Sequence, residues 1–246
     1  MNWKQRLSAM AVHIIFSLFL LLIALFLVFH LWYPAPLDKA MGVGTVFWII
    51  LIIDLILGPL LTFAVFNPKK KELKMDLFFI VMIQLGAYFY GLHTVAQGRP
   101  VFQVFVVDDI ELVRAIDLKY ESNLKIDKDY VSHIFAQPRW VSAVYSSDPK
   151  IAQQQKQEEI FGNSLASRPE TYQPFESRED QIKSKLLQLH DLYKYNKNEN
   201  VEKILRIYSN EKIIGFLPVK GFEEDMTVLI GEDGEPVAIV DLRPWK

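Results

Sequence analysis

The sequence predicts a membrane protein with three N-terminal transmembrane helices followed by a small α+β domain with antiparallel hairpins. Three observations lead to this prediction. Residues 1–98 carry 7 Lys+Arg and 4 Asp+Glu, whereas residues 99–246 carry 20 and 25. The first part contains long uncharged apolar runs, and the second part alternates apolar with polar residues, as strands do. We therefore expect a transmembrane anchor over 1–98 and a folded domain over 99–246.

The composition excludes several classes of protein. The chain has no cysteine, which excludes disulfides, cysteine-bound zinc, iron–sulfur clusters and thiol catalysis. The second part has a net negative charge, whereas a nucleic-acid partner would require clustered Lys and Arg. We therefore expect no nucleic-acid partner.

The first membrane helix is expected over about residues 10–33. The 31 residues between Arg6 and Asp38 include no Lys, Arg, Asp or Glu, and about 20 apolar residues suffice to cross a bilayer core. A signal peptide is the competing interpretation, but the run exceeds a ~7–15-residue signal region and no small-residue cleavage motif ends it. Trp32 and Tyr33 are typical of a membrane boundary, and Pro34 stops a helix.

Two further apolar runs predict membrane helices over about 44–66 and 77–94. The basic residues that flank these helices indicate their orientation. Lys and Arg precede the first helix, and the segment 69–74 between the second and third helices is rich in Lys. The positive-inside rule places both segments in the cytoplasm. Three crossings then place the C-terminal domain on the opposite side of the membrane, which for a bacterial inner membrane is the periplasm.

The second part shows strand patterns and helix patterns. Strand patterns occur at 101–107, 110–116, 204–208, 212–216, 227–230 and 236–240. The last four are expected to form two hairpins, and Asp233-Gly234 is a strong turn signal for the second hairpin. A polar segment that contains several prolines, at about 119–179, separates the first two strand patterns from the rest. We expect a short helix over 149–159 capped by Asp148, and an amphipathic helix over 178–195.

Asp54 is the most informative single residue, because a carboxylate in the middle of a membrane helix is costly. It precedes Gly58 and Pro59, and the proline exposes a backbone carbonyl and kinks the helix. Together with Thr62, these residues define a polar notch inside the membrane. Two interpretations stay open: the notch docks another membrane helix, or Asp54 is hydrogen-bonded internally to Gln84 or Tyr88.

The sequence offers no support for an enzyme, a metal site or a cofactor. It contains no GxSxG, P-loop or GxGxxG motif, and its histidines do not form a metal-binding pair with acidic neighbours. Asp108, Asp109 and Glu111 lack the ligand spacing and the glycine of a calcium loop, which favours a turn at a strand end. We therefore predict no catalytic, metal-binding or cofactor-binding residues.

Four strings in the first 114 residues resemble a known family. They are Trp32-Tyr33-Pro34-Ala35-Pro36-Leu37, Asp54 to Thr62, Lys71 to Leu77, and Tyr90 to Thr94 with Gly98-Arg99-Pro100-Val101-Phe102 and Phe105 to Asp108. In this order they resemble the TfpX/TfpZ type IV pilin accessory family, which includes FimB-like proteins. The resemblance extends over about residues 10–114.

The resemblance implies an inner-membrane accessory protein, or chaperone, that binds and stabilises a cognate type IV pilin and promotes its assembly into pili. The expected partners are the major pilin, through both its helix and its head, and the lipid bilayer. Asp54, Gly58, Pro59 and Thr62 would contact the pilin helix. The boundary motif, comprising Trp32, Tyr33, Pro34, Pro36, Arg99 and Pro100, would lie at the membrane surface. The Arg99–Pro100 segment and the periplasmic domain would contact the pilin head.

A rival hypothesis is a membrane-bound enzyme or modifier that acts on pilin or lipid through an intramembrane or strand-end carboxylate. A periplasmic sensor is disfavoured, because the cytoplasmic segments are too short for an output domain. The sequence leaves open which pilin is recognised and whether the chain dimerises.

Overall fold

A computed structural model describes residues 3–120 and 126–245. The chain forms two compact units. One comprises residues 1–31 and 43–97, and the other comprises residues 32–42 and 98–246. The short segment 32–42, which the sequence analysis assigned to the anchor, therefore groups with the α+β domain.

The first unit contains three helices that are long and apolar enough to cross a membrane. The first consists of α1 (Trp3–Leu25) and a π-helical segment, Phe26–Trp32. The second consists of α3 (Val43–Ile52), a π-helical segment (Ile53–Leu57) and α4 (Gly58–Val65), and the third is α5 (Leu73–Gly98). The three predicted apolar spans are thus confirmed as helices.

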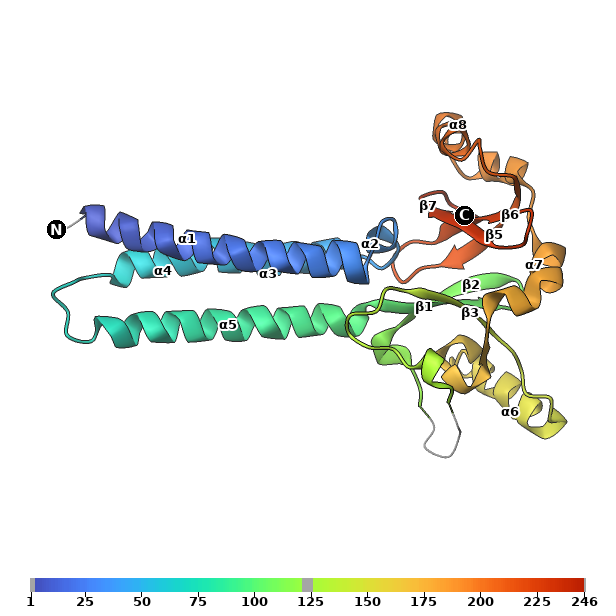
Figure 1. The fold of residues 1–246 in the computed structure, drawn as a ribbon, viewed down its shortest axis with the longest axis horizontal. Coiled ribbons are helices and arrows are strands. Elements are labelled where there is room, and N and C mark those ends of the chain that lie inside the picture. Colours follow the sequence, from blue (N-terminus) through green and yellow to red (C-terminus); the bar gives the residue numbers. More distant parts are fainter. Residues whose placement is uncertain (1–2, 121–125, 246) are drawn as a thin grey trace. The chain divides into compact units, whose positions relative to one another are not determined.

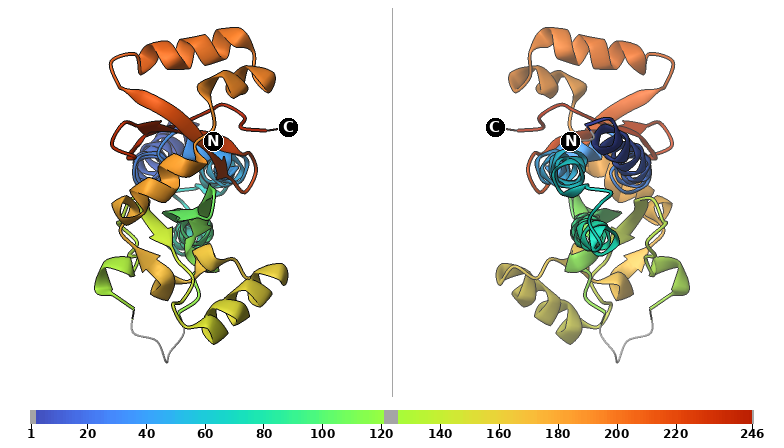
Figure 2. Two further views of the ribbon diagram at one scale, coloured as in Figure 1. Left: turned by 90° about the vertical axis from the view of Figure 1, so that its right-hand side faces the viewer. Right: turned by 90° about the vertical axis from the view of Figure 1, so that its left-hand side faces the viewer.

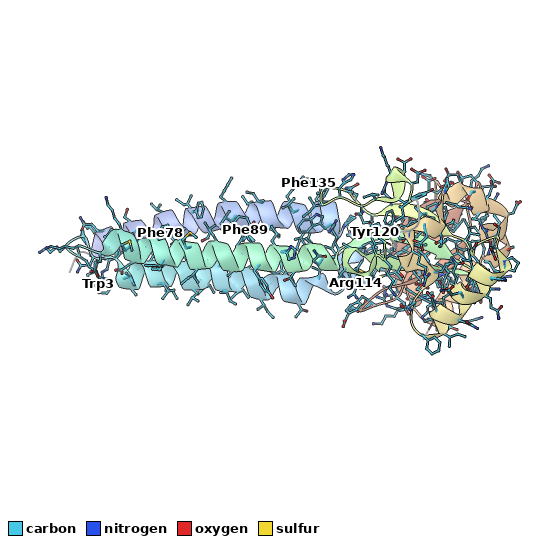
Figure 3. The ribbon with its side chains drawn as sticks, turned by 90° about the horizontal axis from the view of Figure 1, so that it is seen from below. Trp3, Phe78, Phe89, Arg114, Tyr120 and Phe135 are labelled. Atoms are coloured by element: carbon cyan, nitrogen blue, oxygen red, sulfur yellow. The ribbon has the colours of Figure 1, made fainter. Side chains whose placement is uncertain are left out.

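The three long helices lie side by side (Figures 1 and 2). Large apolar side chains cover their outer surfaces, and Phe78 and Phe89 project outward from α5 (Figure 3). Such a surface is suited to hydrocarbon rather than water. Inside the unit, Phe29 and Phe47 pack edge to face with their ring centroids 5.0 Å apart.

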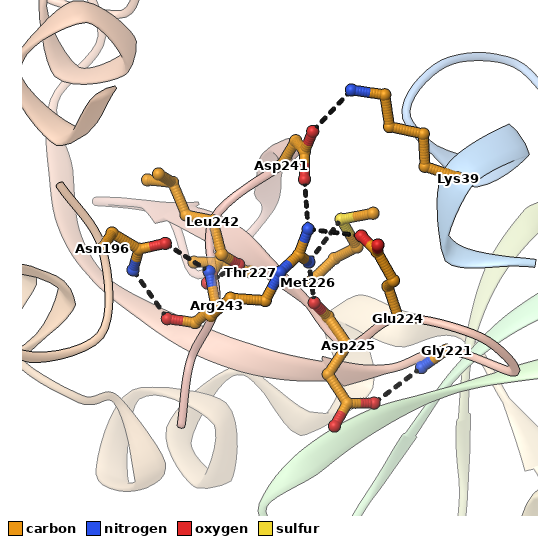
Figure 4. Close-up of polar contacts among 10 residues, drawn as sticks. All are labelled: Lys39, Asn196, Gly221, Glu224, Asp225, Met226, Thr227, Asp241, Leu242 and Arg243. Atoms are coloured by element: carbon orange, nitrogen blue, oxygen red, sulfur yellow. Dashed lines mark hydrogen bonds and ion pairs between the residues drawn. The ribbon is translucent and has the colours of Figure 1, made fainter. Parts of the chain in front are cut away.

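Residues 32–42, which we call the connector, include the short helix α2 (Leu37–Ala40) and pack into the α+β domain. The Ala40 side chain is fully buried in the domain core. The Ala40 carbonyl accepts hydrogen bonds from the amides of Glu223, at 2.8 Å, and Glu224, at 3.3 Å. Lys39 pairs with Asp241 (Figure 4). The connector is therefore held to the α+β domain by both core packing and polar contacts.

The described part of the α+β domain contains a mixed seven-stranded sheet in the order β4-β3-β1-β2-β5-β6-β7. The strands are β1 (Pro100–Val106), β2 (Asp109–Arg114), β3 (Arg139–Ala143), β4 (Tyr172–Gln173), β5 (Ile213–Lys220), β6 (Met226–Gly231) and β7 (Pro236–Val240). The β1–β3 and β2–β5 pairs are parallel, and the other neighbouring pairs are antiparallel.

Short helices join and cover the strands. The α-helices are α6 (Pro149–Ile160), α7 (Glu179–Lys185) and α8 (Asn198–Ile207). The 3₁₀ turns are Ala115–Asp117, Lys128–Tyr130, Leu165–Ser167, Pro169–Thr171, Phe175–Arg178 and Leu189–Lys194. Both faces of the central strands are buried: on β6, Val228 faces one core cluster and Leu229 faces another.

Several local predictions are confirmed. The strands expected at 101–107 and 110–116 are β1 and β2, which pair antiparallel. The expected second hairpin is β6–β7, with Gly234 at a positive φ of 80° in its turn. The Asp148 carboxylate caps α6 by accepting a hydrogen bond from the Lys150 amide at 2.8 Å, as expected for an N-cap.

The predicted helix over 178–195 is wrong in its length. Within this range only α7, Glu179–Lys185, is an α-helix. The chain then becomes extended, and a 3₁₀ turn follows at Leu189–Lys194. The reason is backbone pairing: the Leu187 amide and carbonyl exchange hydrogen bonds with Phe216 at 2.9 and 3.1 Å. Gly215 makes this approach possible, because a Cβ there would lie 2.8 Å from the Leu187 carbonyl oxygen.

The first predicted hairpin, 204–208 with 212–216, is also wrong. Residues 198–207 form α8, and only the second segment is a strand, within β5. Val201, Ile204 and Leu205 follow a helical spacing and pack against the core around Leu192. The apolar run at 204–208 is therefore one face of a helix that begins before it.

Candidate functional site

The polar notch predicted in the second membrane helix lies where that helix changes its hydrogen-bonding pattern. Pro59 has no amide hydrogen and would clash with the preceding turn of a regular α-helix. The π-helical segment Ile53–Leu57, which contains Asp54, directly precedes α4, and Pro59 lies in the first turn of α4. A π-helical turn accommodates such an interruption and often marks a functional position.

Gln84 of α5 fills the notch from the neighbouring helix. Its Nε2 donates a hydrogen bond of 3.2 Å to the backbone carbonyl of Asp54. This approach depends on Gly58, because a Cβ at that position would lie 1.7 Å from Gln84 Nε2. The internal partner considered from sequence is thus present, but it binds the backbone of Asp54 and not the carboxylate.

Two further hydrogen bonds cross between the membrane helices. Thr62 is buried, and its hydroxyl lies 2.7 Å from Nδ1 of His13 on α1. The Tyr88 hydroxyl on α5 donates to the Leu20 carbonyl on α1 at 2.9 Å. Hydrogen bonds of this kind hold membrane helices together where the surrounding side chains are apolar.

A small cavity lies among these groups. Its volume is about 20 Å³, which is enough for about one group of the size of a water molecule. Its polar lining consists of His13, Ser17, Asp54, Gln84 and Tyr88, within an otherwise apolar wall. Asp54 Oδ2 and Gln84 Oε1 are buried acceptors without a hydrogen-bond partner among the described residues. The cavity is therefore suited to a hydrogen-bond donor.

A wider apolar groove lies beside the cavity. Its volume is about 700 Å³, and it is bordered by α1, the end of the second membrane helix and α5. His13, Phe16 and Val81 line both the groove and the cavity. Thr62 also lines the groove. The wall of this groove is thus mostly apolar, and its polar lining residues are Gln5, Ser8 and the hydrogen-bonded pair His13 and Thr62.

The four predicted notch residues have different positions. Gly58, Pro59 and Thr62 are buried between the chain's own helices, and Asp54 is half-buried at the cavity. Contact of these four residues with a partner helix stays a prediction. The sequence analysis gave no site role to His13, although His13 and Ser17 stand four residues apart in an apolar run and therefore share one helix face.

The boundary motif is part of the α+β domain. Trp32 is almost fully buried, and its Nε1 donates a hydrogen bond of 2.6 Å to the Ile134 carbonyl. Tyr33 is also buried, and a Cβ on Gly98 would lie 3.2 Å from its hydroxyl. The hydroxyl thus reaches the residue that ends the third membrane helix.

The other boundary residues shape the connector and the first strand. The carbonyls of Pro34 and Pro36 accept hydrogen bonds that form the turn at α2. Arg99 is buried and its carbonyl accepts from the Ala115 amide at 2.9 Å, while Pro100 begins β1 opposite Arg114. The structure thus assembles both halves of the motif within one unit.

The acidic residues after β1 take part in ion pairing. Asp109 Oδ2 lies 2.6 Å from the Lys220 ammonium on β5. Burial raises the pKa of the Asp109 carboxyl, and the hydrogen bond with Lys220 opposes this rise. Glu111 accepts a hydrogen bond from Ser164 at 2.6 Å. Over residues 3–120 and 126–245, no group of three or more His, Cys, Asp and Glu side chains is placed to hold a metal ion.

Comparison with known proteins gives consistent results. A family model described as fimbrial assembly protein FimB matches residues 1–42. The fimbrial assembly protein of serogroups C1 and C2 of Dichelobacter nodosus is 39% identical over 121 residues, which cover 47% of this chain and 92% of that protein. The fimbrial assembly proteins of serogroups I and E1 from the same organism are also 39% identical over 121 residues, but this covers only 47% of each. No solved structure matches the chain.

Proposed function

Because the chain belongs to the FimB fimbrial assembly protein family, we propose that it is an inner-membrane accessory protein that binds a cognate type IV pilin and chaperones its assembly into pili. Family membership supports a role in fimbrial assembly. The observation that carries the more specific proposal is the apolar groove on the membrane helices, which adjoins a polar cavity.

The proposed orientation places the N-terminus in the cytoplasm and the α+β domain in the periplasm. The Lys-rich segment 69–74 between the second and third helices supports this orientation through the positive-inside rule. The connector and the α+β domain share one core, so they emerge together on the opposite side from that segment. A pilin with one membrane helix and a periplasmic head would meet the two units of this chain in the same order.

In this proposal the pilin helix lies in the groove. The exposed part of the groove is apolar, which suits a helix from the bilayer, and small or kinked positions allow close helix approach. Gly58 leaves room for the Gln84 amide, while Asp54 and the His13–Thr62 pair provide polar groups near the occupant. The boundary motif and the α+β domain would then contact the pilin head.

Photocrosslinking tests the groove. Val12 lines the groove and is exposed, whereas Ile83 is equally exposed on α5 but is not part of the groove lining. A photoreactive amino acid at Val12 should capture pilin in cells, and the same amino acid at Ile83 should not. Equal capture at both positions, or capture at neither while pili still depend on the protein, would contradict the proposal.

Substitution of Asp54 separates this proposal from acid catalysis. Asp54→Asn keeps the size and most hydrogen bonding of the side chain but removes its acid. If the protein acts by binding, piliation should fall only partly and pilin crosslinking at Val12 should weaken in parallel. Complete loss of piliation with normal protein level and normal crosslinking would favour an enzyme or modifier.

A further inference from the structure

Two loops of the α+β domain are hydrogen-bonded to residues at the ends of membrane helices. Trp32 is the last residue of the first span, and its indole donates to the Ile134 carbonyl at 2.6 Å. Arg99 follows the last residue of the third span, and its carbonyl accepts from the Ala115 amide at 2.9 Å. These contacts join both loops to residues at the ends of the first and third spans.

A third loop is tied to the start of the second span. The Ala40 carbonyl, three residues before Val43, binds the amides of Glu223 and Glu224. Gly221 packs closely against the same carbonyl, because a Cβ on it would lie 2.7 Å from the Ala40 oxygen. Each of the three spans therefore has a residue at one of its ends, or within three residues of it, that is hydrogen-bonded to a separate loop of the α+β domain.

Each of these loops exposes a large apolar side chain next to its bonded residue. Ile116 is 61% exposed, Phe135 is 71% exposed and Phe222 is 64% exposed. We call these three residues the membrane-contact patch. Each of the three is the direct sequence neighbour of a hydrogen-bonded residue: Ile134, Ala115 or Glu223. Because consecutive Cα atoms lie about 3.8 Å apart, each exposed side chain lies close to one of these hydrogen bonds.

Neighbouring side chains support the position of this patch. The Arg114 guanidinium lies 4.2 Å from the centroid of the Phe222 ring and also binds the Asp117 carboxylate at 2.6 and 3.0 Å. Phe135, Arg114 and Tyr120 lie at one end of the α+β domain (Figure 3). Arginine and tyrosine beside exposed apolar residues are typical of a membrane–water interface.

We propose that the membrane-contact patch inserts into the interfacial layer of the lipid bilayer, so that the α+β domain rests on the membrane at three points besides its covalent attachment. The occupant is lipid because the patch is built from three loops, each tied to a residue at or beside a different helix end. Transfer of an exposed apolar side chain from water into an apolar environment is favourable. The proposal concerns the lipid contact of the domain and does not depend on pilin binding.

Site-directed fluorescence in nanodiscs tests this proposal. Because the chain has no cysteine, the variants Ile116→Cys, Phe135→Cys and Phe222→Cys each provide one labelling site for an environment-sensitive NBD fluorophore. The full chain is placed in nanodiscs of phosphatidylcholine and phosphatidylglycerol without any other protein. Nanodiscs leave both membrane faces accessible to aqueous iodide.

Phe161→Cys is the matched control. Phe161 is 84% exposed and follows α6, which lies at the other end of the α+β domain from α2 (Figure 1). We expect NBD at the three patch positions to be blue-shifted, quenched several-fold more by lipids with a shallow nitroxide than NBD at Phe161, and protected from iodide. Unchanged near-ultraviolet circular dichroism should confirm that each variant is folded.

Two outcomes would overturn the proposal. Iodide quenching at the patch equal to that at Phe161, without lipid quenching, would place the patch in water. Protection from both quenchers would mean that protein covers the patch, which in this preparation means a second copy of the chain. If only the Phe135→Cys variant misfolds, Ile116→Cys and Phe222→Cys test the same prediction on independent loops.

Discussion

The Lys39 ammonium lies 2.7 Å from Oδ2 of Asp241, so an ion pair joins the connector between the first two membrane helices to the chain just after the last strand. Asp241 also binds Arg243, which contacts Glu224 at 2.6 Å (Figure 4). Because Glu224 also donates its amide to the Ala40 carbonyl, one polar network holds the connector, the β5–β6 turn and the C-terminal segment together.

Acidification should weaken this network. Burial by itself would raise the pKa of the Asp241 carboxyl, but Lys39 and Arg243 outweigh it and hold that pKa below its ordinary value. A lowered folded-state pKa means that the stabilisation is fully present above about pH 4 and is lost as the pH falls through the folded-state pKa. Thermal unfolding of the full chain in detergent at pH 7 and at pH 3 should show this, and Asp241→Asn should reduce the difference.

Loss of the Lys39 charge should have a small effect at neutral pH. Lys39 is largely exposed, so Lys39→Ala should lower the free energy of unfolding by only about 0.2–1 kcal/mol. Lys212→Ala breaks the fully surface-exposed pair with Glu232 and serves as the control. A larger loss for the control than for Lys39→Ala would contradict a role for the connector in stability.

Gly58→Ala should destabilise the membrane unit. The new methyl would force the Gln84 amide to move and would displace its hydrogen bond to the Asp54 carbonyl, at a cost of about 0.5–1.5 kcal/mol. Gly86→Ala is the control, because a Cβ on Gly86 meets nothing within 4 Å. Unfolding in detergent should rank the variants, and Gln84→Ala should relieve the effect of Gly58→Ala. Equal stability of the two glycine variants would refute the close contact.

Gly221→Ala should disrupt the backbone hydrogen bonds between Ala40 of the connector and the β5–β6 turn. A Cβ there would lie 2.0 Å from the Glu224 carbonyl oxygen and 2.7 Å from that of Ala40. Both are backbone atoms, so no side-chain rotation relieves the overlap, and we expect a loss of about 1–3 kcal/mol or more. Limited proteolysis should then cut the connector faster than in Gly44→Ala, whose Cβ would occupy open space.

Val201→Ala tests the helix that replaces the first predicted hairpin. Val201 is fully buried against the sheet, so loss of its two methyl groups should cost about 1.5 kcal/mol or more. Ile207, at the end of the same helix, is 61% exposed, and Ile207→Ala should change stability by no more than about 0.5 kcal/mol. The opposite ranking in thermal unfolding would show that this helix does not pack as described.

Local pattern was enough to predict the three membrane helices, β1 with β2, the β6–β7 hairpin and the cap at Asp148. Each of these depends on neighbours in sequence: apolar run length, strand alternation, a turn dipeptide or a side chain beside its own backbone. The stop of α7 depends instead on backbone pairing with Phe216, a distant partner that overrides local periodicity. The helix α8 does have a local signal, because Val201, Ile204 and Leu205 follow a helical spacing, but the short run 204–208 taken alone does not show it.

The candidate site divides in the same way. Asp54 and Pro59 stand out in the sequence because a carboxylate and a proline are both costly within a membrane helix. Their surroundings do not follow from that pattern. Whether Gln84 bonds the Asp54 carboxylate or its carbonyl depends on the absence of a side chain at Gly58, and the partner of Thr62 comes from a different helix.

The sequence by itself determined that the chain has three apolar helices long enough to cross a membrane, followed by an α+β domain, because run length and periodicity act locally. Only the tertiary structure decided that the connector belongs to that domain. Ala40 is buried in a core cluster that includes Phe105 of β1, Leu217 of β5 and Met226 of β6, all distant from it in the sequence, and such packing depends on the fold as a whole.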